Sequence, residues 1–276
     1  MENNEEKISP ETPGAFCPVK FRKTDFALLS GIVLLAALLV FLQRVMEPEM
    51  GRDSCYYLRL VEQWHHGGFN GVLKVLPDFW FPPLHLYVTT LFTFTGLSPE
   101  NSAVAFGMIC AVLLPLVSCA IAYEMFRDRR IALGAALLTA VNPSVIEMAV
   151  QAQRDVPYLL SAGVCLYLLI SAIRRKGWLR WIGAGAAFAV ALLIRYETAE
   201  FLPLLGIYFV TALCKKQEKW YVIVRNLFIF ALSGVVFAVI LLYVSGTLSY
   251  MAGSYCRYFT NQIKAVQKLY NGGQKK

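Results

Sequence analysis

The stretch FALLSGIVLLAALLVFL, residues 26–42, contains no charged side chain and is the first of several long apolar runs in the chain. A membrane-spanning α-helix needs about 20 predominantly apolar residues, so this stretch predicts such a helix. The composition agrees, because 57% of the 276 residues are hydrophobic and only 16% are charged. Mean hydropathy is +0.53. Soluble domains carry about 25% charged residues, so we expect an all-α polytopic membrane protein.

The alternative for residues 26–42 is a signal peptide. The preceding leader is long and acidic, and no small-residue cleavage site follows, which favours a membrane span. Further apolar runs cover residues 102–126, 131–149, 156–173, 181–194, 201–213 and 222–244. The runs 181–194 and 201–213 are short, and we expect them to form a hairpin that borrows residues from its flanks. About seven transmembrane helices are therefore predicted.

The segment WFPPLHLYVTTLFTFTG, residues 80–96, decides the topology. If it does not span the membrane, four basic clusters fall on one face, as the positive-inside rule requires. These clusters are Lys20/Arg22/Lys23, Arg127/Arg129/Arg130, Arg174/Arg175/Lys176/Arg180 and Lys215/Lys216/Lys219. We therefore expect an interfacial helix that begins at Pro82-Pro83 and is anchored by Trp80 and Tyr87. The N-terminus then lies in the cytoplasm, and residues 43–101 form a large outer loop.

Three parts of the chain follow from this topology. Residues 1–19 are polar and acidic and are expected to be a disordered cytoplasmic tail. Residues 20–245 form the transmembrane module, and residues 246–276 form an amphipathic C-terminal segment with apolar residues at helical spacing. Cys55 and Cys256 are the cysteines that could meet on the outer side. The net charge of +8 is dispersed among membrane segments, so no nucleic acid is expected as a partner.

Polar residues concentrate just after the first apolar run, in GRDSCYYLRLVEQWHHGG, residues 51–68. Asp53, Tyr57, Leu60 and Trp64 follow one another at intervals of four, three and four residues, so on a helix they share one face. Asp53 would stand at the start of that helix. An N-cap is one interpretation, and a general base at the mouth of a membrane cavity is the other. The two are compatible if the helix end positions the carboxylate.

The predicted outer ends of later spans add further charged residues. Arg154 and Asp155 lie in QAQRDVPY, residues 151–158, and Arg195 and Glu197 lie in RYE, residues 195–197. Purely structural interpretations are an N-cap at Asp155 and an ion pair between Arg195 and Glu197. Ionisable residues at membrane depth usually face a cavity or a partner, and arginine binds phosphate bidentately. These residues therefore predict a site for a lipid-borne phosphate.

The sequence contains three histidines, which are candidates for further site residues or metal ligands. His85 belongs to the predicted outer face, whereas His65 and His66 are adjacent and lack a spaced carboxylate, so a solvated loop pair is a better interpretation than a metal site. The chain has no Walker loop, GxGxxG or GxSxG motif, and therefore no recognisable nucleotide site or hydrolase nucleophile. We expect no cofactor, with a divalent cation left open.

The order of these features resembles a known family. The quoted 51–68 segment is followed by FPPLHLYVTTLFTFTG, YEMFRDRRIALGAALLTAVNPSVIEMAVQAQRDVPYLL and ALLIRYETAEFLPLL. This order is similar to the N-terminal membrane module of GT-C glycosyltransferases, within the protein O-mannosyltransferase, aminoarabinose transferase-like and RgtA/B/C/D-like group. The resemblance covers residues 20–244, and it implies a first outer loop with juxtamembrane helices.

The resemblance also implies roles for individual residues. Asp53 matches the family's catalytic acid and Asp155 a further acid at the start of the fourth span. Arg195, with Arg154, would hold the donor phosphate, while Tyr57, His85, Tyr158 and Glu197 would border the substrate cavity. The implied reaction moves a sugar from a polyprenyl-phosphate-sugar to a glycan, lipid or protein acceptor, with inversion. It would take place on the outer face of a bacterial inner membrane.

Two other functions stay open. A transporter or flippase for a lipid-linked compound would also need charged residues around an outward cavity, although the spans show no repeat. A truncated, noncatalytic membrane subunit is the third interpretation, because the family's usual second half is missing from these 276 residues.

Overall fold

The computed structural model describes residues 21–46, 50, 52–175, 177–215 and 219–253. These residues form ten labelled α-helices, a 3-10 helix, η1, and a further helical stretch at residues 248–253, with no β-strand among them. The helices are α1 (Lys23–Met46), α2 (Arg52–Val75), α3 (Leu84–Thr93), α4 (Pro99–Phe126), α5 (Arg129–Ala140), α6 (Pro143–Val150), α7 (Asp155–Arg175), α8 (Trp178–Ile194), η1 (Tyr196–Glu200), α9 (Phe201–Cys214) and α10 (Trp220–Val244). The predicted all-α membrane fold is confirmed. The tail 1–19, Cys256 and residues 254–276 of the expected C-terminal segment lie outside the described residues.

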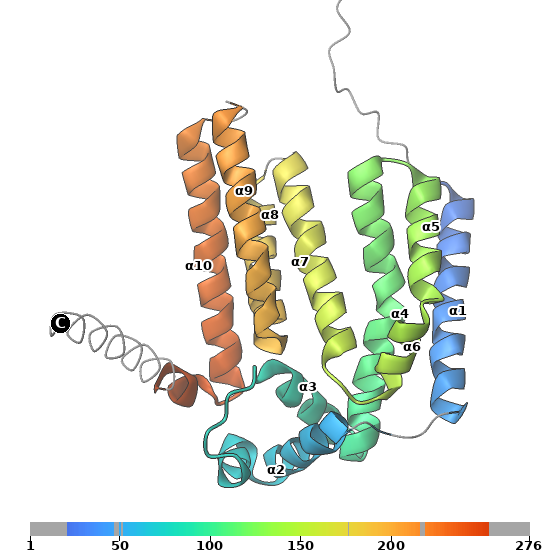
Figure 1. The fold of residues 1–276 in the computed structure, drawn as a ribbon, viewed down its shortest axis with the longest axis vertical. Coiled ribbons are helices and arrows are strands. Elements are labelled where there is room, and N and C mark those ends of the chain that lie inside the picture. Colours follow the sequence, from blue (N-terminus) through green and yellow to red (C-terminus); the bar gives the residue numbers. More distant parts are fainter. Residues whose placement is uncertain (1–20, 47–49, 51, 176, 216–218, 254–276) are drawn as a thin grey trace, which may run out of the picture.

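Most helices stand side by side as a bundle (Figure 1). Five helical stretches are long and apolar enough to cross a membrane, namely α1, α4, α7, the joined η1–α9 and α10. The bent pair α5–α6 is also long and apolar enough if it is counted as one span, and α8, with 17 residues, is a shorter apolar helix. Each predicted apolar run therefore coincides with one of these seven apolar segments of the described chain. Since η1 extends α9 to a 19-residue stretch, the expected borrowing of flanking residues is also confirmed.

One predicted span is broken. Residues 131–149 were expected to form a continuous helix, but α5 and α6 meet at an angle of 48°. Asn142 caps α6 by accepting hydrogen bonds from the backbone N–H groups of Ser144 and Val145, at 3.0 and 3.4 Å. Pro143 follows at the first helical position, where it has no N–H to donate to the preceding turn. A cap and a proline together end one helix and start another.

The bundle is held together by close helix packing. Helix α8 packs against α7 and α10, and α4 packs against α1, α5 and α7. Trp181, Phe188 and Phe230 are buried in the core between α8 and α10. A Cβ on Gly185 would collide with the Ser233 hydroxyl and the Phe230 carbonyl of α10. Small residues therefore let these two helices approach closely, as is common in membrane bundles.

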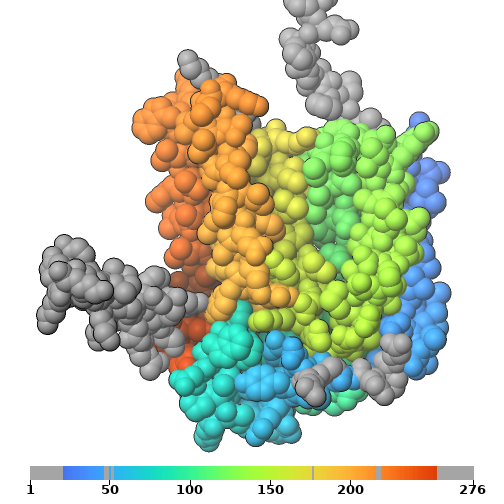
Figure 2. All heavy atoms as spheres, viewed as in Figure 1, coloured from blue at the N-terminus to red at the C-terminus, as the bar shows by residue number. Residues whose placement is uncertain are grey.

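Helices α2 and α3 cover one end of the bundle, which we call the α3 end (Figures 1 and 2). Helix α2 bends at Gly68, whose φ of 59° and ψ of −160° are accessible mainly to glycine. Helix α3 has ten residues and is about 15 Å long, too short to cross a bilayer. Pro83 forms its N-cap, so the expected short helix after Pro82-Pro83 is confirmed.

The other end of the bundle carries the predicted basic clusters, and we call it the basic end. Their described members lie at the ends of α4, α7 and α9 and at the starts of α1, α5, α8 and α10. These helix ends share one side of the bundle, opposite α2 and α3 (Figure 1). The prediction that the four basic clusters lie on one side of the bundle, with residues 80–96 not counted as a span, is therefore correct for the described residues.

Candidate functional site

The candidate site lies at the α3 end, where Arg195 joins three chain segments. Helix α8 ends at Ile194, and Arg195 is extended, with φ −149° and ψ 130°. Its guanidinium donates one hydrogen bond to the Asp155 carboxylate at the start of α7 and another, of 3.0 Å, to Glu197 in η1. The hydrogen bond to Glu197 raises the pKa of Arg195, so the side chain stays cationic. The anticipated Arg195–Glu197 pair is present, and Asp155 extends it to a triad.

Arg154 lies next to this triad but is surrounded differently. Its guanidinium carbon is 5.9 Å from the centre of the Tyr57 ring and 5.7 Å from that of Phe81. These are cation–π distances. Among the described residues no carboxylate lies within 4.0 Å of Arg154. The positive charge of Arg154 is therefore less neutralised than that of Arg195, which has two carboxylates.

The hydroxyl of Tyr57 is influenced by four of the predicted charged residues. This side chain is 9% exposed, and burial raises its pKa. The charges of Asp53 and Asp155 also raise this pKa, whereas those of Arg154 and Arg195 lower it. Four charged residues, in α2, at the start of α7 and just after α8, therefore affect the pKa of one hydroxyl. Tyr158, the remaining aromatic residue of the predicted set, has its ring centre 5.3 Å from the Arg195 guanidinium.

His85 is buried beside Tyr57, and its side chain is only 2% exposed. Its ring lies edge-on to Tyr57, with the ring centres 5.9 Å apart, and at the same distance from Phe106. Burial and the charge of Arg154 lower the pKa of His85 to about 3. Neither ring nitrogen has a hydrogen-bond partner among the described residues. A neutral imidazole with unused hydrogen-bonding capacity therefore forms part of the site.

Asp53 lies in the first turn of α2 and is exposed. The helix begins one residue earlier, at Arg52, so Asp53 is its second helical residue and the N-cap interpretation is wrong. Tyr57, Leu60 and Trp64 follow on the buried face as predicted. Asp155 is likewise the first helical residue of α7 rather than its cap, because the Arg154 carbonyl accepts the hydrogen bond from Tyr158 N–H.

Two residues that shape the site were not predicted from the sequence. Ser54 is fully buried and donates a hydrogen bond to the Gln151 carbonyl, which ties the start of α2 to the α6–α7 turn. Phe81 supplies one of the two rings that contact Arg154. Both contacts join segments far apart in the chain, so no local pattern marked them.

The two adjacent histidines lie on helix α2, not in a loop, so that interpretation is wrong. His65 Nδ1 is 2.6 Å from Thr93 Oγ1 of α3, and His66 is exposed. Within the described part of the chain no group of three or more His, Cys, Asp or Glu side chains could hold a metal ion.

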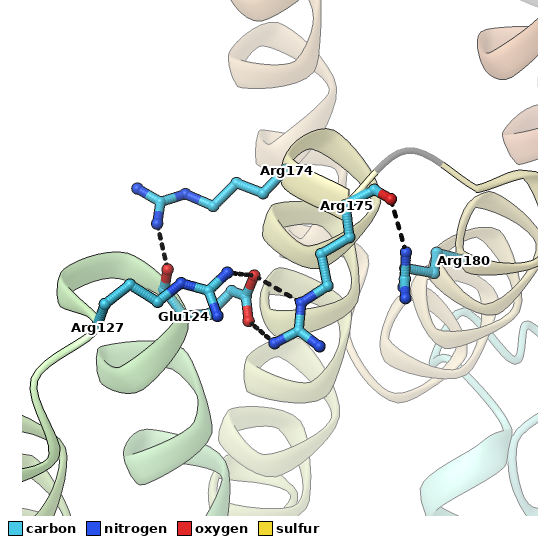
Figure 3. A network of polar contacts seen from close by, with 5 residues as sticks. All are labelled: Glu124, Arg127, Arg174, Arg175 and Arg180. Carbon is cyan, nitrogen blue, oxygen red and sulfur yellow. Dashed lines mark hydrogen bonds and ion pairs between the residues drawn. The ribbon is translucent and has the colours of Figure 1, made fainter. Parts of the chain in front are cut away.

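A second polar cluster, absent from the sequence prediction, lies at the basic end (Figure 3). The side chain of Glu124 is 1% exposed, and its carboxylate accepts hydrogen bonds from Arg127, at 2.5 Å, and Arg175. Arg174 donates to the Glu124 carbonyl. An acid at the end of an apolar run was the available signal. The cluster joins α4 to α7 by neutralising a buried charge.

Comparisons with known proteins agree with this architecture. The family described as dolichyl-phosphate-mannose-protein mannosyltransferase matches residues 81–243, more than half of the chain. No curated protein sequence matches significantly. Among solved structures, the archaeal oligosaccharyltransferase AglB from Archaeoglobus fulgidus, in complex with an inhibitory peptide and a dolichol-phosphate, is similar with a TM-score of 0.63. The identity is 15%, and the similarity covers 90% of this chain but 34% of AglB, so the chain spans about a third of that protein.

Proposed function

Because the chain belongs to the dolichyl-phosphate-mannose-protein mannosyltransferase family, we propose that it transfers a sugar from a polyprenyl-phosphate-linked donor to a hydroxyl of an acceptor glycan, lipid or protein. The fold is that of GT-C membrane glycosyltransferases. The observation that carries the proposal is that Arg154, against the ring of Tyr57, directly precedes Asp155 in the chain, and that Asp155 is bound by Arg195 at the same end of the bundle. The dolichol-phosphate bound to AglB supports a lipid phosphate as the ligand class.

Arg154 is the first candidate to bind the donor phosphate. Its guanidinium contacts aromatic rings and, among the described residues, forms no ion pair, so a phosphate would not have to displace a carboxylate. Arg195 is the second, since it is already bound to Asp155 and Glu197. In this assignment Asp155 positions Arg195 rather than reacting itself. Charge-assisted hydrogen bonds from these arginines would stabilise the phosphate as it leaves.

Asp53 is the proposed general base. It is exposed at the start of α2 and is close enough to affect the pKa of Tyr57. The acceptor oxygen attacks the anomeric carbon, the bond from that carbon to the phosphate oxygen breaks, and Asp53 takes the acceptor proton. The phosphate is already the leaving group, so a nucleotide is not needed. A single displacement inverts the configuration at the anomeric carbon.

A transfer assay tests this function. The full chain in liposomes is given a panel of labelled polyprenyl-phosphate-sugars and mixed acceptors, and we expect transfer from at least one donor. Asp53→Asn should reduce transfer at least about 100-fold, as is typical when a general base is removed, while donor binding is retained. Asp78→Asn is the matched control, because Asp78 is also exposed at the α3 end but belongs to no part of the site.

Three results would contradict the proposal. Transfer by Asp53→Asn at the wild-type rate would exclude Asp53 as the base. Donor-dependent flux across the liposome without sugar transfer would identify a transporter. An unmutated chain that transfers no sugar from any donor would support a noncatalytic subunit.

We also propose that the α3 end faces outward across a bacterial inner membrane, because basic residues favour the cytoplasmic side. Cys55 is exposed in α2, and Cys214 is exposed at the basic end of α9. In two variants that each keep one of these cysteines, a membrane-impermeant maleimide should label Cys55 and leave Cys214 unlabelled in intact cells. The reverse pattern would invert the topology.

A further inference from the structure

A cavity of about 470 Å³ lies at the basic end, between α7, α8, α9 and α10, far from the candidate site. Its polar and aromatic lining comes from three helices and the residue before α10, namely Trp178, Trp181, Tyr208, Lys219, Arg225 and Asn226. The volume is that of a typical small-ligand pocket. Nothing in the proposed transfer reaction uses this cavity.

The lining of the cavity is cationic. Lys219 and Arg225 contribute two positive charges, and none of the described lining residues is an aspartate or a glutamate. Arg225 lies in the second turn of the apolar helix α10, about 8 Å from its start. A charged side chain at this depth of a membrane helix is costly unless it meets a partner or a ligand. The cavity therefore favours an anion.

Arg225 differs from three arginines at the same end that have a carboxylate partner. Arg127 and Arg175 are bound to Glu124 (Figure 3), and Arg129 is 3.3 Å from Asp25. Among the described residues the guanidinium of Arg225 makes one hydrogen bond, of 3.3 Å, to the amide oxygen of its neighbour Asn226. One neutral, weak hydrogen bond leaves most of the guanidinium's donors available for a ligand.

The aromatic residues indicate which kind of anion fits. Trp178 is 57% exposed and Trp181 is buried at 2%, so the indole rings form both the rim and the inner wall. Tryptophan is enriched at the level of lipid headgroups, and basic pockets between transmembrane helices bind anionic headgroups. We propose that this cavity binds an anionic phospholipid, with its headgroup phosphate at Arg225 and Lys219 and its apolar part against the indole rings.

Lipid titration of the purified full chain, followed by native mass spectrometry in a neutral detergent, tests the proposal. Phosphatidylglycerol should bind saturably, whereas phosphatidylcholine should bind at least about tenfold more weakly. Arg225→Gln should weaken phosphatidylglycerol binding about tenfold or more, because a charge-assisted contact is lost. Arg225→Lys keeps the charge and should retain part of the affinity.

Arg130→Gln is the matched control. It removes the same charge from the same end of the bundle, but Arg130 is exposed and does not line the cavity. Equal phosphatidylglycerol affinity in the Arg225→Gln and Arg130→Gln variants, with unfolding temperatures like that of the wild type, would overturn the proposal. So would equal binding of phosphatidylcholine. If inorganic phosphate displaced phosphatidylglycerol at concentrations similar to that of the lipid, the cavity would be a site for free phosphate, and the proposal of a phospholipid ligand would be wrong.

Discussion

The guanidinium of Arg195 donates a hydrogen bond to the carboxylate of Asp155, forty residues earlier in the chain. This contact joins the end of α8 to the start of α7 at the α3 end of the bundle. Both side chains are partly buried, with exposures of 27% and 30%. The pair therefore links the packing of two helices to the place where the proposed donor phosphate binds.

Substitutions of the two site arginines should have different effects. Arg195→Ala should lower both donor affinity and thermal stability, since Arg195 also binds Asp155 and Glu197. Arg195→Lys keeps the charge without the planar fork and should weaken donor binding less. Arg154→Gln should weaken donor binding about tenfold or more with little change in stability. Donor titration and thermal unfolding measure the two effects, and unchanged binding in both Arg195→Ala and Arg154→Gln would leave these residues a structural role only.

Two glycines on α8 provide a matched test of helix packing. A Cβ on Gly185 would collide with Ser233 and the Phe230 carbonyl, whereas a Cβ on Gly183 would meet Leu168 at an ordinary 3.7 Å. Gly185→Ala should therefore destabilise the protein by about 1–3 kcal/mol. Gly183→Ala should be neutral or stabilise it by up to about 1 kcal/mol, because alanine favours the helix. Equal unfolding temperatures for the two variants would show that α8 and α10 do not approach closely at Gly185.

Removal of the buried acid at the basic end should be costly. Glu124→Ala leaves Arg127 and Arg175 without their carboxylate and should destabilise the protein by about 3–5 kcal/mol. Glu100→Ala is the comparison, since Glu100 forms an ion pair with Arg44 at 2.6 Å but is 46% exposed. Its loss should cost less than about 1 kcal/mol. Denaturant unfolding in detergent measures both, and similar losses would mean that water reaches Glu124.

The neutral His85 should make the protein acid-sensitive. Its pKa is about 3 in the folded state and near 6.5 when exposed, so the unfolded state binds the proton first. Stability from this residue is fully present above pH 6.5 and is lost progressively as the pH falls toward 3. His85→Gln should flatten that part of the profile of unfolding temperature against pH, whereas His66→Gln, at an exposed position, should not. Identical profiles for all three proteins would show that His85 is hydrated.

Much of the fold is visible in the sequence because hydropathy and capping are local properties. Six of the seven apolar runs, the short helix after Pro82-Pro83 and the separation of basic clusters from α2 and α3 were predicted correctly. The break between α5 and α6 was missed although its signal, Asn142 before Pro143, is also local. Apolarity on both sides of that signal led to one continuous span.

The sequence alone determined which residues share an end of the bundle, since each apolar run reverses the chain direction and so brings its flanking charges to one of the two ends. The tertiary structure decided how those residues pair. In the structure Asp155 accepts a hydrogen bond from Arg195, Arg154 contacts aromatic rings, and His85 and Glu124 are buried. These contacts depend on the distance and rotation between helices, which are determined by side-chain packing between distant segments and leave no periodic trace along the chain.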